Sequence, residues 1–438
     1  MRIPYLLNFG LFLLTLILSL TTDWNPPKWT EFNDPDDYLH QSTLPLNSRE
    51  FYAPHQTGTF FPRPFTVPLF YKMAGGKPQV IIQMQRVIHS LATLFLAYAL
   101  LLIINRIWIK YLVLFCVYLL MSWWNILGWA SQLLSESLSM SLMFCWIASF
   151  ILLWKKKNPM FIAAHILITI LFSFTRDTWP YVIVLFYLLI SIFTLFSRRS
   201  FLPKALLLLT CSVMLFFVQL NTARVGHRQR LPLMNTMAVR ILHDPDYTAW
   251  FEVRGMPDVQ KLHPIYRKVN VNVDSDRHKI WNIYWNKDYH AFSDWTINDG
   301  RQAYTKFLIT HPSYFLFFHE SRQELNRIFA YNLWYTPNLR GYSKLTEPLF
   351  PLFGVMSVSI ISLILVILVF IKRKAVLLFP VLLYLIFLAN VFLSYNADAL
   401  EVERHLFVTM IAIQMIGVIA VALIFDQTLN SLPSRKKQ

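Results

Sequence analysis

Long apolar runs recur along this chain and constrain its fold more than any other feature. A helix that crosses a bilayer needs about 17–25 mostly apolar residues. Ten such runs follow one another, at roughly 4–21, 80–104, 109–127, 134–154, 159–175, 180–197, 202–220, 349–371, 375–394 and 405–425. The third and fifth are marginal in length. The pattern predicts an all-α polytopic membrane protein with about ten transmembrane helices, the first kept as an anchor because no small-residue cleavage site follows it.

Composition argues against a soluble fold. Hydrophobic residues make up 55% of the chain and charged residues 15%, whereas a soluble domain has about 25% charged residues. The formal charge of +16 could suggest nucleic acid, but the basic residues form short clusters between apolar runs, so we expect no nucleic-acid partner. The three cysteines lie inside apolar stretches and are assigned to packing: Cys116, Cys145 and Cys211.

The basic clusters also predict an orientation, because short cytoplasmic loops carry an excess of Lys and Arg. The clusters are Arg106/Lys110, Lys155–Lys157, Arg198/Arg199/Lys204, Lys372–Lys374 and Arg435–Lys437. One orientation places all these clusters and both termini in the cytoplasm. The membrane that the chain is predicted to cross is the plasma membrane. The predicted organisation is a catalytic transmembrane module at 1–220, an extracytoplasmic cap loop at 221–348 and C-terminal helices with a basic tail at 349–438. A long first outer loop, 22–79, precedes the second run, and helical pieces are expected in the cap, for example at 301–333.

Ionisable residues recur in the predicted outer segments, where the membrane edge makes them costly and often functional. They are Asp34, Asp36, Asp37 and Arg63 in the first loop, Glu136, Arg176 and Asp177 in two turns, and Glu403, Arg404 and His405 in the last. Plainer roles compete: a solvated Asp-Pro turn, a helix-terminal charge, a local ion pair, or lipid-headgroup contact.

This combination suits transfer of a sugar from a lipid phosphate. A carboxylate can act as general base on an acceptor, arginines can hold a phosphate, and apolar helices can hold a lipid tail. The sequence has no phosphate-binding Gly-x-x-x-x-Gly-Lys loop and no Gly-rich dinucleotide turn. The cap histidines lack zinc-ligand spacing, so no metal ligands are assigned. No cofactor is required, although magnesium or manganese bridging the first-loop carboxylates and the donor is compatible with the pattern.

The same motifs resemble those of polytopic membrane glycosyltransferases of the C-type fold (GT-C), in particular the bacterial group similar to protein mannosyltransferases and lipid A aminoarabinose transferases. The motifs are Asp34–Leu39, Arg63–Leu69, Glu136–Leu138, Arg176-Asp177 and Glu403–His405. The resemblance implies that a first-loop aspartate is the catalytic base: Asp34 is favoured, Asp37 is the main rival, and Asp36 stays open. It implies that Arg404 binds the donor phosphate, helped by Arg176, Arg63 and His405, with Glu136, Asp177 and Glu403 in support.

The resulting hypothesis is an integral membrane glycosyltransferase. It moves a sugar from a polyprenyl-phosphate donor to an envelope glycan, lipid or protein on the extracytoplasmic face. If the resemblance holds, the anomeric centre inverts in a single displacement. The alternatives are a transporter or flippase of lipid-linked sugars, and a non-catalytic membrane scaffold. Transporters more often carry their charges near the bilayer midplane, whereas these charges gather at one interface.

Overall fold

The computed structural model describes most of the chain as helices. The described residues are 3–21, 34–55, 60–155, 158–197, 199–266, 286–316, 329, 355–371, 375–398 and 402–431, and they contain no β-strand. Some side chains inside these ranges, among them those of Asp34 and Glu403, are not described.

Seven described helices or helix segments are long and apolar enough to cross a membrane: Ile3–Thr21, Pro78–Ile103, Ser135–Lys155, Trp179–Phe196, Leu202–Val225, Phe379–Ala397 and Arg404–Gln427. Three more apolar helices are shorter, Ile107–Met121, Pro159–Ser173 and Ser357–Val366. The predicted all-α membrane architecture is therefore confirmed. Each predicted apolar run falls on a helix, and seven of these helices reach spanning length.

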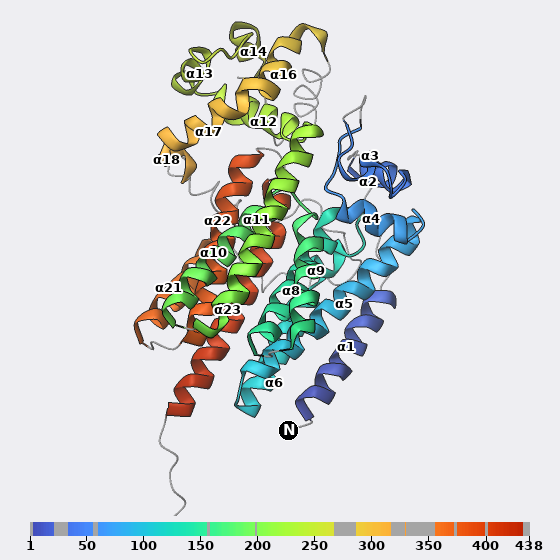
Figure 1. The fold of residues 1–438 in the computed structure, drawn as a ribbon, viewed down its shortest axis with the longest axis vertical. Helices are drawn as coiled ribbons and strands as arrows, with labels where there is room; N and C mark the ends of the chain where they lie inside the picture. The colour runs from blue at the N-terminus through green and yellow to red at the C-terminus, as the bar shows by residue number, and fades with distance from the viewer. Residues whose placement is uncertain are drawn as a thin grey trace, which may run out of the picture.

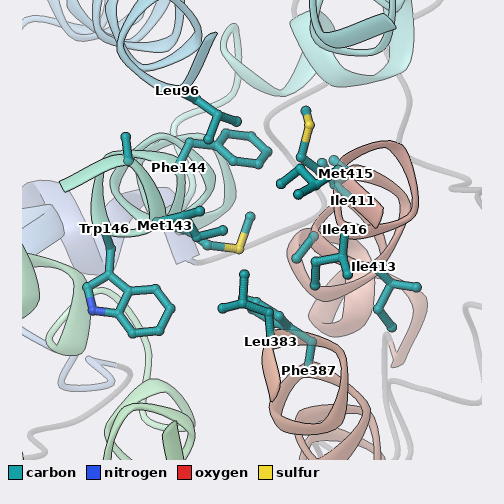
Figure 2. Packing of buried hydrophobic residues seen from close by; sticks show 14 of the residues in the cluster. Leu96, Met143, Phe144, Trp146, Leu383, Phe387, Ile411, Ile413, Met415 and Ile416 are labelled. Carbon is teal, nitrogen blue, oxygen red and sulfur yellow. The ribbon is translucent and has the colours of Figure 1, made fainter. Parts of the chain in front are cut away.

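The long helices form one bundle (Figure 1). Its members are α1 (Ile3–Thr21), α5 (Pro78–Ile103), α6 (Ile107–Met121), α8 (Ser135–Lys155), α9 (Pro159–Ser173), α10 (Trp179–Ser197), α11 (Leu202–Val225), α21 (Val355–Ile371), α22 (Ala375–Ala397) and α23 (Val402–Ser431). Helix α8 is apolar on all sides after its first turns and is buried along most of its length, as expected for a helix surrounded by others. Its Met143 and Phe144 meet Leu96 of α5, Leu383 of α22 and Ile411 of α23 in the core (Figure 2).

Buried polar side chains between the helices find partners within the bundle. The His165 Nε2 atom of α9 lies 2.6 Å from the Tyr187 hydroxyl of α10, and its Nδ1 atom lies 2.7 Å from the Ser149 hydroxyl of α8. Trp146 Nε1–H donates to the same Tyr187 hydroxyl at 3.0 Å. These bonds satisfy groups that would be costly to leave unpaired in hydrocarbon. The sequence position of His165 within an apolar run is thus explained by helix packing.

Shorter helices gather at one end of the bundle, opposite the end where α1 begins (Figure 1). Between α1 and α5 lie α2 (Asp34–Thr43), α3 (Arg49–Tyr52) and α4 (Thr66–Met73). We call the part between α1 and α5 the first loop and residues 226–316 the cap. The end of the bundle where both lie is the cap end. The cap contains α12 (Arg230–Thr236), a π-helix (Met237–Ile241), α13 (Pro245–Glu252), α14 (Val259–Tyr266), α16 (His290–Trp295), a second π-helix (Thr296–Gly300), α17 (Arg301–Thr310) and α18 (Pro312–Phe315). Short helices Trp124–Trp129, Arg199–Phe201 and Lys287–Tyr289 complete the described set.

The cap has an apolar core of its own. Met234, Ile241, Phe251, Phe292 and Phe307 are fully buried within it. Helix α11 continues to Val225, so the change from bundle to cap comes a few residues after the predicted boundary at 220. The predicted helical segment 301–333 is helical over α17 and α18, and its residues 317–328 and 330–333 lie outside the described part.

Candidate functional site

The first turn of α8 carries a fully buried carboxylate at the cap end. Ser135, Glu136 and Ser137 open the helix, and the Glu136 side chain has no exposed surface. A negative charge is favourable at a helix N-terminus, where the backbone dipole is positive. The dipole alone does not compensate a buried charge, which needs a paired cation.

Two arginines from other elements supply that pairing. Arg404 Nε, in the first turn of α23, donates to Glu136 Oε1 at 2.8 Å. Arg176 Nη2, from the turn between α9 and α10, reaches the same oxygen at 3.3 Å. Both arginine side chains are largely buried, and among the described residues Glu136 Oε2 has no hydrogen-bond partner. Two positive charges therefore converge on the one carboxylate of Glu136.

The turn that carries Arg176 is anchored to α8 and to the first loop. Ser139, one helical turn after Glu136, accepts hydrogen bonds from Thr175 Oγ1 at 3.1 Å and Trp179 Nε1 at 2.6 Å. Residues three apart share a face of a helix, so these bonds hold the turn over the face that carries Glu136. The Thr66 amide of α4 donates to the Phe174 carbonyl at 3.2 Å. The first loop therefore reaches the turn beside Arg176.

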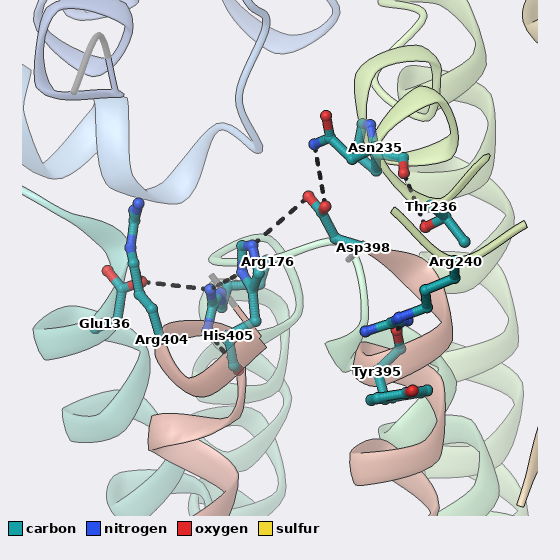
Figure 3. Close-up of polar contacts among 10 residues, drawn as sticks. Glu136, Arg176, Asn235, Thr236, Arg240, Tyr395, Asp398, Arg404 and His405 are labelled. Carbon is teal, nitrogen blue, oxygen red and sulfur yellow. Dashed lines mark hydrogen bonds and ion pairs between the residues drawn. The ribbon is translucent and has the colours of Figure 1, made fainter. Parts of the chain in front are cut away.

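His405 extends the group toward the cap (Figure 3). Arg176 donates from Nη1 to the His405 carbonyl at 3.0 Å and from Nη2 to its Nδ1 at 2.7 Å. On the other side of the ring, Nε2 lies 3.7 Å from Asp398 Oδ2. Asn235 Nδ2, in α12 of the cap, donates to Asp398 Oδ1 at 3.1 Å. A continuous row of polar contacts therefore runs from Glu136 to the cap.

The first loop holds a second buried charge pair. Asp37, on α2, receives hydrogen bonds from Arg63 Nη2 at 2.7 Å and Nε at 3.2 Å, and from the Phe61 amide at 3.0 Å. Gln41, one turn further along α2, bonds the Arg63 amide and carbonyl. These contacts make Asp37 and Arg63 a clamp that closes the first loop. Asp36 is exposed, and Asp34 begins α2 with its side chain outside the described set.

Asp177 faces a different direction from its neighbour Arg176. Its carboxylate accepts from Arg228 Nη2 at 2.9 Å and from Gln219 Nε2. Arg228 follows α11, so this pair ties the α9–α10 turn to the start of the cap. It acts as a structural brace between two elements.

Four of the predicted site residues therefore come together: Glu136, Arg176, Arg404 and His405. Asp37 and Arg63 form a pair of their own, Asp177 pairs with Arg228, and the Glu403 side chain lies outside the described set. Sequence reasoning assigned no role to Asn235, Asp398 or Arg228. Asp398 lies in the same predicted outer turn as Arg404. Its partner Asn235 is 163 residues away in the sequence, and no local pattern predicts that contact.

In the described part of the chain, no group of three or more His, Cys, Asp or Glu side chains is arranged to hold a metal ion. Both oxygens of Asp37 accept hydrogen bonds from N–H donors.

Comparison of the chain with protein-family models, with curated proteins and with solved structures found no match. The chemistry of the site is therefore argued from its own geometry. A largely buried pair of arginines suits an anion, because guanidinium groups bind phosphate oxygens with directed, charge-assisted hydrogen bonds.

Proposed function

We propose that this chain is an integral membrane glycosyltransferase that takes a sugar from a polyprenyl-phosphate donor. The observation that carries the proposal is the convergence of Arg176 and Arg404 on Glu136 at the cap end of an apolar helix bundle. A lipid phosphate would bring negative charge to the arginines while its isoprenoid chain stays among apolar helices. A soluble anion would gain only the first of these contacts.

The proposed reaction is a single displacement. The acceptor oxygen or nitrogen forms a bond to the anomeric carbon as the bond from that carbon to the phosphate oxygen breaks. The phosphate leaves with the electron pair, and the arginines stabilise its developing charge. A first-loop carboxylate takes the acceptor proton. Asp34 is our first choice, because the Asp37 carboxylate is occupied by Arg63 and Phe61, and Asp36 remains the exposed alternative.

The proposal includes a topology and a family. Ten crossings with both termini in the cytoplasm would put the cap, the first loop and the Arg176–Arg404 pair on the extracytoplasmic face of the plasma membrane. The cap would then select the envelope acceptor, whether glycan, lipid or protein. The motif order supports a GT-C enzyme, for which inversion at the anomeric centre is expected.

The test is turnover by purified protein in nanodiscs with a panel of polyprenyl-phosphate sugars, followed as release of polyprenyl phosphate. Arg404→Ala and Arg176→Ala should each lower turnover by about 100-fold or more, the range for removal of one oxyanion donor. Arg254→Ala is the matched control, because this exposed cap arginine packs on the Trp250 ring and donates to the Trp250 carbonyl. It should leave turnover unchanged.

The base is identified by comparing Asp34→Asn, Asp36→Asn and Asp37→Asn in the same assay. The catalytic base should lose turnover with its fold intact, whereas Asp37→Asn should lower turnover and stability together because it opens the clamp. Absence of turnover with every lipid-linked sugar would refute the glycosyltransferase, and a flippase or a scaffold would become the better reading of the bundle.

A further inference from the structure

Asp398 and Asn235 are not among the residues expected to bind the donor, but they connect to Arg176 through His405. Asp398 lies between α22 and α23, where its carboxylate meets Asn235 of the cap on one oxygen and faces His405 on the other (Figure 3). His405 in turn contacts Arg176 through both its ring and its backbone carbonyl. The row links a cap helix to the anion-binding arginine in three steps.

The chemistry of the donors fixes the state of the histidine ring. A guanidinium group has donors and no acceptor, so the 2.7 Å contact from Arg176 Nη2 requires a lone pair on His405 Nδ1. A neutral ring then carries its proton on Nε2, which is the atom that faces Asp398. The carboxylate is thus placed to favour the one tautomer that can accept from Arg176.

The cap is seated on the end of α22 by contacts that adjoin Asp398. The Arg240 guanidinium stacks 3.6 Å from the centre of the Tyr395 ring and donates to the Tyr395 carbonyl. Asn396 donates to the Phe315 carbonyl of α18 at 3.3 Å. These contacts hold α12 where Asn235 can bond Asp398.

We propose that Asp398 and His405 are positioning residues for Arg176, and that Asn235 completes the set while the cap is seated. Arg176 then reaches the geometry that holds a phosphate only with the cap docked on α22. This inference rests on the proposed function, because it concerns the same anion site.

The experiment measures binding of decaprenyl phosphate to the full chain in nanodiscs, without any sugar transfer. Asn235→Ala and Asp398→Asn should each weaken binding by about fivefold, within the range of couplings carried by contacting networks. In an Arg176→Ala background the same substitutions should have no further effect, because the residue through which they act is gone. A purely structural role would lower affinity equally in both backgrounds.

Two substitutions at His405 test whether its Nδ1 atom is the one that positions Arg176. The Asn oxygen in His405→Asn lies the same number of bonds from the backbone as Nδ1 and can accept from Arg176, so binding should stay within about threefold of wild type. His405→Leu removes the acceptor and should weaken binding by about fivefold, as Asp398→Asn does.

The outcomes separate the two proposals. If wild type binds decaprenyl phosphate and Arg176→Ala weakens binding, but the Asn235 and Asp398 variants bind as wild type does, the positioning role is refuted and the proposed function stands. If wild type does not bind the lipid phosphate, the proposed function fails and the positioning role fails with it.

Discussion

Three carboxylates at the cap end bond arginines. They differ in how many arginines each one bonds. Asp37 pairs with Arg63, and Asp177 pairs with Arg228. In the described part of the chain, Glu136 alone bonds two arginines. At Glu136, therefore, two arginines meet one fully buried carboxylate, an arrangement that suits an anionic ligand.

Replacing Glu136 tests this charge balance. Glu136→Gln leaves two largely buried arginines without their carboxylate, and loss of one partner of a buried pair costs about 3 kcal/mol or more. We expect a lower free energy of unfolding in mixed micelles. Added decaprenyl phosphate should recover more stability in this variant than in wild type, because the phosphate supplies the missing negative charge.

The control is Glu252→Gln on the exposed face of α13, which should change stability by less than about 0.5 kcal/mol, as surface substitutions do. A Glu136→Gln protein as stable as this control, and unaffected by the lipid phosphate, would contradict the assignment of Glu136 as the counter-ion of the arginine pair.

At the scale of elements, the helices were predictable because length and apolarity are local properties. Each apolar run contains its own evidence, as the match of the fourth run with Ser135–Lys155 illustrates. The gathering of Glu136, Arg176, Arg404 and His405 was foreseen only as a common membrane face. Their contacts depend on how the α9–α10 turn packs on Ser139 of α8, which no local pattern contains.

The contact between the first loop and the cap also joins residues far apart in the sequence. Gly226 lies at this contact. A Cβ at Gly226 would lie 3.0 Å from the Pro54 carbonyl oxygen and 3.1 Å from Pro62 Cβ. Because one contact is to backbone, Gly226→Ala should cost about 1–3 kcal/mol, the usual range for overpacking. Unfolding in mixed micelles measures the loss, and limited proteolysis should show earlier cleavage in the first loop.

Gly10 offers the matched control for that substitution. It lies within α1 with nothing within 4 Å of a built Cβ, so Gly10→Ala should be neutral or stabilise by up to about 1 kcal/mol through helix propensity. Equal effects of the two substitutions would mean that the first loop does not rest on the base of the cap.

Considered as a whole, the molecule has two unlike ends. The cap end gathers the first loop, the cap and the paired charges, and α1 begins at the opposite end (Figure 1). Helix α8 runs from Glu136 at the cap end to Lys155, and α11 runs from Lys204 to the start of the cap. A helix of 24 residues is about 36 Å long at about 1.5 Å per residue, enough to separate two membrane surfaces. Lys155 and Lys204 therefore lie at the end away from the cap. The proposed topology, which follows the positive-inside rule, puts this end in the cytoplasm.

This assignment predicts which cysteines a membrane-impermeant maleimide can reach. In a chain whose native cysteines are replaced by alanine, Asn298→Cys presents an exposed thiol on the cap, and Met160→Cys presents one at the start of α9. Intact cells should be labelled at position 298 and not at position 160, and opening the membrane should make position 160 reactive. Labelling at position 160 in intact cells would mean that the orientation is the reverse, with the arginine pair on the cytoplasmic face.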